Sequence, residues 1–113
     1  MGNGGRDYAI QKHSICDLKR SYIYGSLGFI TGHELMHGFD STGVFVDMHT
    51  NPGPWLSREF YTQFEERTTC LEKMYTDSKI PGFTGKVDGK ITLNENIADN
   101  EGVKLAFKVS PTR

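Results

Sequence analysis

The sequence predicts a mainly α fold of about three helices with short strand or hairpin connections. Apolar residues recur at steps of three and four over residues 20–39, which is the helical period. A stripe of the same period covers residues 57–77. A third helix is expected over residues 93–109, because Pro111 stands just beyond it and proline is common after a helix end.

Composition limits the classes of function. The 113 residues carry a formal net charge of −1 and 36% hydrophobic residues, as an ordinary soluble domain does. No basic run is present and the calculated pI is 6.4, so no nucleic-acid partner is expected. The longest mostly apolar stretch, residues 22–31, is too short for a bilayer, and the N-terminus lacks the apolar core of a signal peptide. We therefore expect no membrane segment or signal sequence in this chain.

The chain divides into residues 1–19, expected to be a flexible N-terminal segment, and a folded region over residues 20–113. The glycines before Tyr8 favour a loose terminus over a short helix there. His13 has no partner at metal-ligand spacing, so it is interpreted as a surface residue.

The first helix, residues 20–39, contains three interior glycines, Gly25, Gly28 and Gly32. Each costs about 1 kcal/mol relative to alanine in a helix interior. Glycines kept at that cost commonly mark the close approach of another backbone. We therefore expect this helix to be buried in its parent fold.

Between the first two helices, residues 41–43 are expected to form a turn and residues 44–46 a short strand. Residues 47–53 are interpreted as a loop, in which His49 is solvated.

The second helix, residues 57–77, has Pro54 before it and Ser57 as its N-cap. Its apolar stripe predicts a structural helix packed against the first one, with Trp55 as an anchor of that packing. The stripe consists of Leu56, Phe60, Phe64, Leu71, Met74 and Tyr75.

The connection to the third helix, residues 79–90, is predicted to be a loop. Asp88-Gly89, between residues 86–87 and 90–91, favours a small hairpin. Thr92 and Glu95 have the spacing of a capping box, but a Glu95 that binds metal cannot turn back, so Thr92 is expected to cap alone.

The first chemical signal is His33-Glu34-Leu35-Met36-His37. Residues four apart lie on one face of a helix, so His33 and His37 can present two imidazole nitrogens to one zinc ion. Glu34 can then reach a water on the open side of the metal. Catalytic zinc takes three protein ligands, so a third must come from elsewhere.

Glu95 and Asp99 supply the second signal, again four residues apart on an expected helix. Glu95 completes a His₂Glu ligand set, which hydrolytic zinc enzymes use. Asp99 is suited to accept a hydrogen bond from the far ring N–H of a liganding histidine, which would fix the tautomer of that ring. Asp40, three residues after His37, can do the same for the first helix.

Each pattern also has an ordinary interpretation. A pair of histidines four apart is often a solvated pair, and acidic residues four apart usually form a wet helix face. A helical protein without metal therefore stays an alternative to the zinc site. The two signals together favour zinc more strongly than either does alone.

The two motifs resemble the neprilysin-like (M13) zinc endopeptidases over roughly residues 22–107. The residues that carry the resemblance are Gly28-Phe29-Ile30-Thr31-Gly32 before the histidine motif, Thr92-Leu93-Asn94 before Glu95-Asn96-Ile97-Ala98-Asp99, and Trp55, Phe60, Thr69-Cys70 and Tyr75 between them. The resemblance implies the thermolysin-like zinc-helix core of a gluzincin peptidase.

By that resemblance one zinc ion is bound by His33, His37 and Glu95. Glu34 is then the catalytic carboxylate, and Asp99 is an acid that supports the site and acts as a proton donor. Residues 20–113 would form part of an M13-type catalytic domain, with the remainder of a larger peptidase fold outside this sequence.

The implied function is zinc-dependent hydrolysis of peptide bonds, with peptides as substrates and a cell-surface or extracellular location. The alternative is a truncated, catalytically inactive remnant that binds zinc or a partner. In the family, the cysteine matching Cys70 pairs with a residue outside this stretch. We therefore expect free thiols at Cys16 and Cys70 over a bond between them.

Overall fold

The computed structural model describes residues 18–110. The expectations for the segment 1–17, including His13, Cys16 and a helix near Tyr8, lie outside the described residues, as does Pro111. From residue 18 onward the chain is mainly helical, as the sequence predicts, with three principal helices.

The first predicted helix is one continuous helical stretch whose pitch changes along its length. Residues 18–23 are α-helical and lead into a π-helical turn, η1 (Tyr24–Gly28). The α-helix α2 (Phe29–Met36) follows, and a 3₁₀ turn, η2 (His37–Phe39), ends the stretch. The predicted helix over residues 20–39 is thus confirmed, and its zinc-motif residues span the end of α2 and the start of η2.

The second predicted helix is α3 (Arg58–Thr76). Its N-cap is Ser57, whose hydroxyl oxygen accepts a hydrogen bond from the Phe60 amide at 3.2 Å. This cap satisfies one of the amides that a helix start leaves without a partner. The sequence-based assignment of Ser57 is therefore confirmed.

The third predicted helix is α4 (Leu93–Val109), and Thr92 begins it differently from expectation. The Thr92 hydroxyl donates to the Asp88 carbonyl at 2.9 Å and accepts from the Asn96 side-chain amide at 2.8 Å. Thr92 makes no side-chain cap bond to the backbone of α4. The expected cap is wrong because these two partners use the hydroxyl.

Two expected β elements are also absent from the described part of the chain. Residues 44–46 fall in and after a 3₁₀ turn, η3 (Gly43–Phe45), and only a single bridge joins Val46 to Pro52. No hairpin forms at residues 86–91, because the Asp88 carboxylate accepts from the amides of Lys90 and Ile91, each at 3.0 Å. This side-chain turn replaces the backbone pairing of a hairpin.

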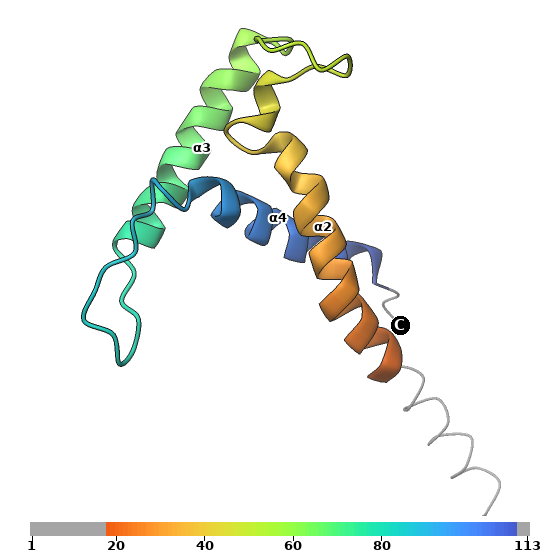
Figure 1. Ribbon diagram of the computed structural model, residues 1–113, viewed down its shortest axis with the longest axis vertical. Helices are drawn as coiled ribbons and strands as arrows, with labels where there is room; N and C mark the ends of the chain where they lie inside the picture. The colour runs from red at the N-terminus through yellow and green to blue at the C-terminus, as the bar shows by residue number, and fades with distance from the viewer. Residues whose placement is uncertain (1–17, 111–113) are drawn as a thin grey trace, which may run out of the picture.

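Figure 1 shows α4 (blue) crossing α2 (orange), with α3 (green) beside the start of α4. Of the described elements, α4 packs against η1, α2, η2 and α3, whereas α3 packs against α4 and touches η3 through the Tyr61 side chain. The prediction that the second helix packs against the first is therefore wrong: α3 packs on α4. Trp55 anchors a loop instead, since its indole N–H donates to the Val44 carbonyl at 3.1 Å.

Few apolar side chains are buried in the described residues. The buried apolar set is Val44, Ile97, Ala98 and Ala106. Large apolar side chains of the first helical stretch are exposed to solvent, with Leu27 64% and Ile30 54% exposed. No helix among residues 18–110 has the length and apolar character needed to cross a membrane.

Candidate metal centre

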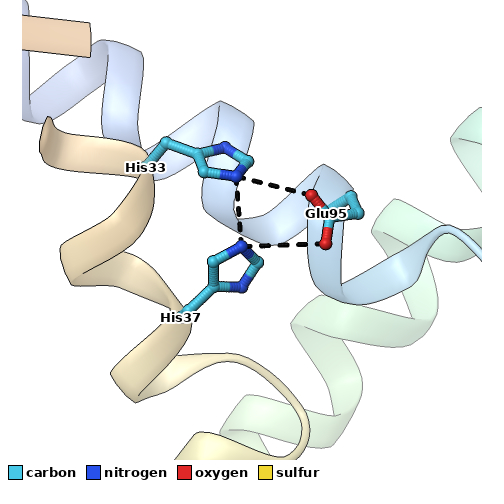
Figure 2. A group of neighbouring side chains, drawn as sticks. All are labelled: His33, His37 and Glu95. Carbon is cyan, nitrogen blue, oxygen red and sulfur yellow. Dashed lines mark hydrogen bonds and ion pairs between the residues drawn. The ribbon is translucent and has the colours of Figure 1, made fainter. Parts of the chain in front are cut away.

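The candidate metal centre lies where the first helical stretch meets the start of α4. His33 and His37 are one helical turn apart and project toward Glu95, which lies in the first turn of α4 (Figure 2). Within residues 18–110 these three residues are the group of histidine, cysteine or acidic side chains that is suited to hold a metal ion.

Two glycines set the distance between the helices. A Cβ atom added at Gly102 would lie 2.6 Å from the His33 backbone nitrogen, and one added at Gly32 would lie 2.8 Å from the Gly102 carbonyl oxygen. Side chains cannot occupy either position, so the two backbones touch directly at His33. Of the three glycines expected to mark a close approach, Gly32 does so, while Gly25 has no atom within 4 Å of its would-be Cβ.

The distances between the three side chains fit one zinc ion. The two histidine Nε2 atoms lie 3.1 Å apart, and Glu95 carboxylate oxygens lie 3.4 Å from Nε2 of His33 and 3.7 Å from Nε2 of His37. Ligands bound at about 2.0–2.1 Å to a tetrahedral zinc lie about 3.3–3.4 Å from one another. The three donors therefore stand close to the separations that such an ion requires.

Hydrogen bonds behind the rings fix which ring nitrogens face this space. Nδ1 of His33 lies 2.9 Å from an Asp99 carboxylate oxygen, and Nδ1 of His37 lies 3.0 Å from an Asp40 oxygen. An ionised carboxylate only accepts, so each neutral imidazole carries its proton on Nδ1. Both Nε2 lone pairs and the Glu95 carboxylate then face the same space, and none of these groups carries a hydrogen to donate. This set of ligand atoms fits a cation.

Asp40 has two tasks at this site. One carboxylate oxygen receives the Nδ1–H of His37, while the other accepts from the amides of Thr42 and Gly43, each at 2.8 Å. The Asp40 side chain is buried, which by itself would raise its pKa. The hydrogen bonds from the Gly43 amide, His37 and the Thr42 amide outweigh that effect and lower the pKa of Asp40. Asp40 is thus held ionised while it orients the His37 ring.

The hydrogen bond between His37 and Asp40 shifts the pKa of the histidine in the opposite direction. The hydrogen bond to Asp40 raises the pKa of His37, burial lowers it by less, and the negative charges of Glu95, Asp40 and Glu34 raise it further. A proton on His37 Nε2 occupies the lone pair that a metal would use. Protons and a metal ion therefore compete for this ring.

The other expected site residues lie as follows. Glu34 is exposed on α2, and its charge reaches His37. Asp99 lies on α4 one turn after Glu95 and holds His33. His49 is exposed in the loop and is not part of the metal-binding group. Cys70 is a free, exposed cysteine on α3; a pairing with Cys16 lies outside the described residues.

Sequence reasoning missed three residues that build the site. Gly102 is the partner of Gly32 at the crossing of α2 and α4. A glycine in the interior of a predicted helix was the sequence feature that could have identified it. Asn94 bonds to the turn after η2, and buried Asn96 bonds to Thr92. Asn94 gave no such signal, because its partners Ser41 and Thr42 lie 53 and 52 positions away in the sequence.

Comparisons with known proteins identify the family of this chain. Residues 9–112 match the model of peptidase family M13. The chain is 45% identical over 85 residues to neprilysin-1 of Caenorhabditis elegans, covering 75% of this chain and 11% of that protein. It is 38% identical over 91 residues to endothelin-converting enzyme-like 1 of Homo sapiens, covering 80% of this chain and 12% of that protein.

The fold matches a solved structure of PepO from Lactobacillus rhamnosis HN001 (DR20) with a TM-score of 0.75 and 28% sequence identity. That match covers 83% of this chain and 15% of the PepO chain. The chain spans 10–12% of the length of the curated relatives it matches. The family match over nearly the whole chain confirms the resemblance carried by the two motifs: the chain belongs to peptidase family M13.

Proposed function

We propose that this chain carries the zinc-binding centre of a metalloendopeptidase, with His33, His37 and Glu95 as the ligands of one zinc ion. The observation that carries the proposal is the convergence of two Nε2 lone pairs and a carboxylate at 3.1–3.7 Å. Membership of peptidase family M13 supports the hydrolytic class, and peptides are the proposed substrates.

The chemistry follows from the positions of these groups. A zinc ion bound here would supply Lewis acidity, which polarises a carbonyl and lowers the pKa of water to about 7. Glu34 would act as general base, accepting a proton from the attacking water and passing it to the leaving nitrogen of the peptide. Its exposure on α2 leaves the carboxylate open to water and to substrate.

Asp99 and Asp40 would keep both ligand rings in the tautomer that leaves Nε2 free. Asp99 is half exposed, and the sequence-based expectation that it also donates a proton in catalysis remains part of the proposal. Asp40 is nearly buried, so we assign it to orientation of His37 alone.

A second candidate is a chain that binds zinc without turnover. Peptide hydrolysis also needs a donor for the developing oxyanion, and losing one donor typically costs a factor of about 10²–10³ in rate. By the resemblance to the family this donor is a histidine, and among residues 18–110 the one histidine outside the ligand set is His49, which is exposed in the loop at residues 47–53. This observation favours zinc binding over activity for the chain by itself.

The test combines metal analysis with turnover. We expect one zinc per chain after dialysis, measured by elemental analysis, and hydrolysis of a peptide panel that needs this zinc. Glu34→Gln should keep the zinc and lower turnover by a factor of about 10²–10⁴, the usual contribution of a general base.

Zinc binding without turnover in the wild type would favour the second candidate. Equal zinc uptake by a His33→Ala/His37→Ala variant, or no uptake by the wild type, would refute the metal centre.

The proposed location is the cell surface or the extracellular space, which rests on the family alone. Labelling of the native protein on intact source cells with a membrane-impermeant reagent tests it. Protection of the protein until the cells are lysed would contradict the proposal.

A further inference from the structure

Asn94, next to the proposed ligand Glu95, joins the two halves of the metal centre directly. Its side-chain oxygen accepts from the Ser41 amide at 3.1 Å, across 53 positions of sequence. Its side-chain nitrogen donates to the Thr42 hydroxyl, also at 3.1 Å. Both functional atoms of one amide are thus used on the short turn that follows η2.

That turn is tied to the first pair of ligands. Asp40 accepts from the Thr42 and Gly43 amides with one oxygen and from His37 with the other. An unbroken run of hydrogen bonds therefore leads from the His37 ring through Asp40 and the turn to Asn94. Its last member is the immediate neighbour of Glu95.

The position of Glu95 depends on such a contact because the helix crossing is distant. The backbones of α2 and α4 touch at Gly32 and Gly102, and Glu95 lies seven residues, about 10 Å, from Gly102 along α4. A tilt of about 10° around that crossing would move Glu95 by about 2 Å at this rise per residue. Zinc–ligand distances fall within about 0.2 Å, so a second fixed point near Glu95 is needed.

The turn at Ser41–Thr42 is sensitive to the loss of a hydrogen bond. The Ser41 hydroxyl is buried without a hydrogen-bond partner within the described chain. Removal of the Asn94 oxygen would take the acceptor from the Ser41 amide as well, next to a polar group already without a partner. A backbone amide left without an acceptor in this part-buried turn would destabilise it.

We propose that Asn94 is a positioning residue that clamps the start of α4 to the turn at Ser41–Thr42 and thereby holds Glu95 at ligand distance from His33 and His37. The proposal rests on the proposed function of the site. Asn94 contacts neither the metal nor a substrate in this role; it acts through the placement of Glu95.

Asn100 provides a matched control on the same helix. Its side-chain nitrogen donates to the Tyr75 hydroxyl at 2.9 Å and to the Asn96 carbonyl at 2.7 Å. Asn100→Ala therefore removes an asparagine with two hydrogen bonds from α4, but one of these bonds leads to α3 and the other stays within α4, so neither reaches the turn. Alanine is the better helix former, so neither Asn→Ala change weakens α4 through helix propensity.

The experiment uses the 113-residue chain as wild type, Asn94→Ala, Asn94→Asp and Asn100→Ala. Zinc dissociation constants are measured by competition with a chelator, and exchange of the Ser41 amide hydrogen is measured by NMR in the zinc-free chain. Asn94→Ala should raise the zinc Kd by about tenfold or more, as loss of groups behind metal ligands typically does, and should speed Ser41 exchange.

Asn94→Asp keeps acceptors for the Ser41 amide and the Thr42 hydroxyl, so it should restore slow exchange and a Kd at or below that of the wild type. Asn100→Ala should leave both near wild type. Equal rises of Kd in Asn94→Ala and Asn100→Ala, or unchanged Ser41 exchange in Asn94→Ala, would overturn the clamp. A wild-type chain that takes up no zinc would refute the proposed function instead, whatever the exchange at Ser41 shows.

Discussion

Two of the contacts that α4 makes, with α2 and with α3, are built in different ways. Against α2 the backbones meet at Gly32 and Gly102, and the His33 ring bonds to the Asp99 carboxylate beside this crossing. Against α3 the contact is carried by side chains, including the bond from Asn100 to the Tyr75 hydroxyl. The contact with α2 cannot accommodate an added side-chain atom at either glycine, whereas the side chains at the contact with α3 can change their conformation.

The difference separates the metal centre from its support. All three proposed ligands lie on α4 and on the helical stretch that contains α2 and η2, and α3 contributes none. α3 instead contacts η3, since the Tyr61 hydroxyl donates to the Val44 carbonyl at 3.2 Å and the Phe45 and Tyr61 rings stack at 4.9 Å. Changes at the crossing should therefore affect zinc, and changes on α3 should affect stability.

The largest effect is expected at the crossing itself. Gly102→Ala places a Cβ atom 2.6 Å from the His33 backbone nitrogen, so the helices must separate. Overpacking of this kind typically costs about 1–3 kcal/mol in unfolding free energy, and zinc binding should weaken with it. Chemical denaturation and zinc titration measure the two quantities.

Gly25→Ala is the matched control, because nothing lies within 4 Å of a Cβ atom there. It should leave zinc affinity unchanged and keep or raise stability, since alanine is favoured over glycine in a helix by about 1 kcal/mol. Similar losses in both variants would show that the crossing is not the rigid contact.

A second prediction concerns pH and the His37–Asp40 pair. Zinc must displace any proton from His37, whose pKa is raised above 6.5 by Asp40, so zinc affinity should fall below that raised pKa by roughly tenfold per pH unit for one displaced proton. Chelator competition from pH 5 to 8 measures this. A zinc affinity independent of pH across this range would contradict the assignment of His37.

The zinc-free chain should depend on pH with the opposite sign near neutrality. A raised His37 pKa contributes stability that is complete below 6.5 and is lost as pH rises through the folded value. The lowered pKa of Asp40 contributes stability that is present above 3.8 and is lost as pH falls through the folded value. Between 3.8 and 6.5 both contributions are present, and Asp40→Asn should flatten this profile in urea unfolding.

The smallest effect is expected on α3. Tyr75→Phe removes the hydroxyl that accepts from the Asn100 amide, at a typical net cost of about 1 kcal/mol. Thermal unfolding should show this loss, while the zinc Kd stays that of the wild type. A zinc affinity that fell as far as in Gly102→Ala would show that α3 is part of the metal centre.

Much of the fold was predictable because its signals are local. Ser57 was recognised as a cap because its partner, the Phe60 amide, lies three residues away. The two predicted β elements did not form because aspartates within or close before these segments bind neighbouring backbone amides. Asp40 and Asp88 bind nearby amides with their side chains and turn the backbone before strands can pair. Whether an aspartate side chain or a neighbouring strand binds these amides depends on the folded conformation, and the apolar periodicity of the sequence carries no information about it.

The sequence by itself determined that His33 and His37 share a face and that Glu95 and Asp99 share another, because a helix fixes the geometry of residues four apart. Tertiary structure alone decided that Asp99 meets His33 across 66 positions, that Gly102 admits α2, and that Asn94 reaches Ser41. The physical reason is that residue spacing sets the directions of side chains within one helix, whereas the distance between two helices depends on the side chains at their contact.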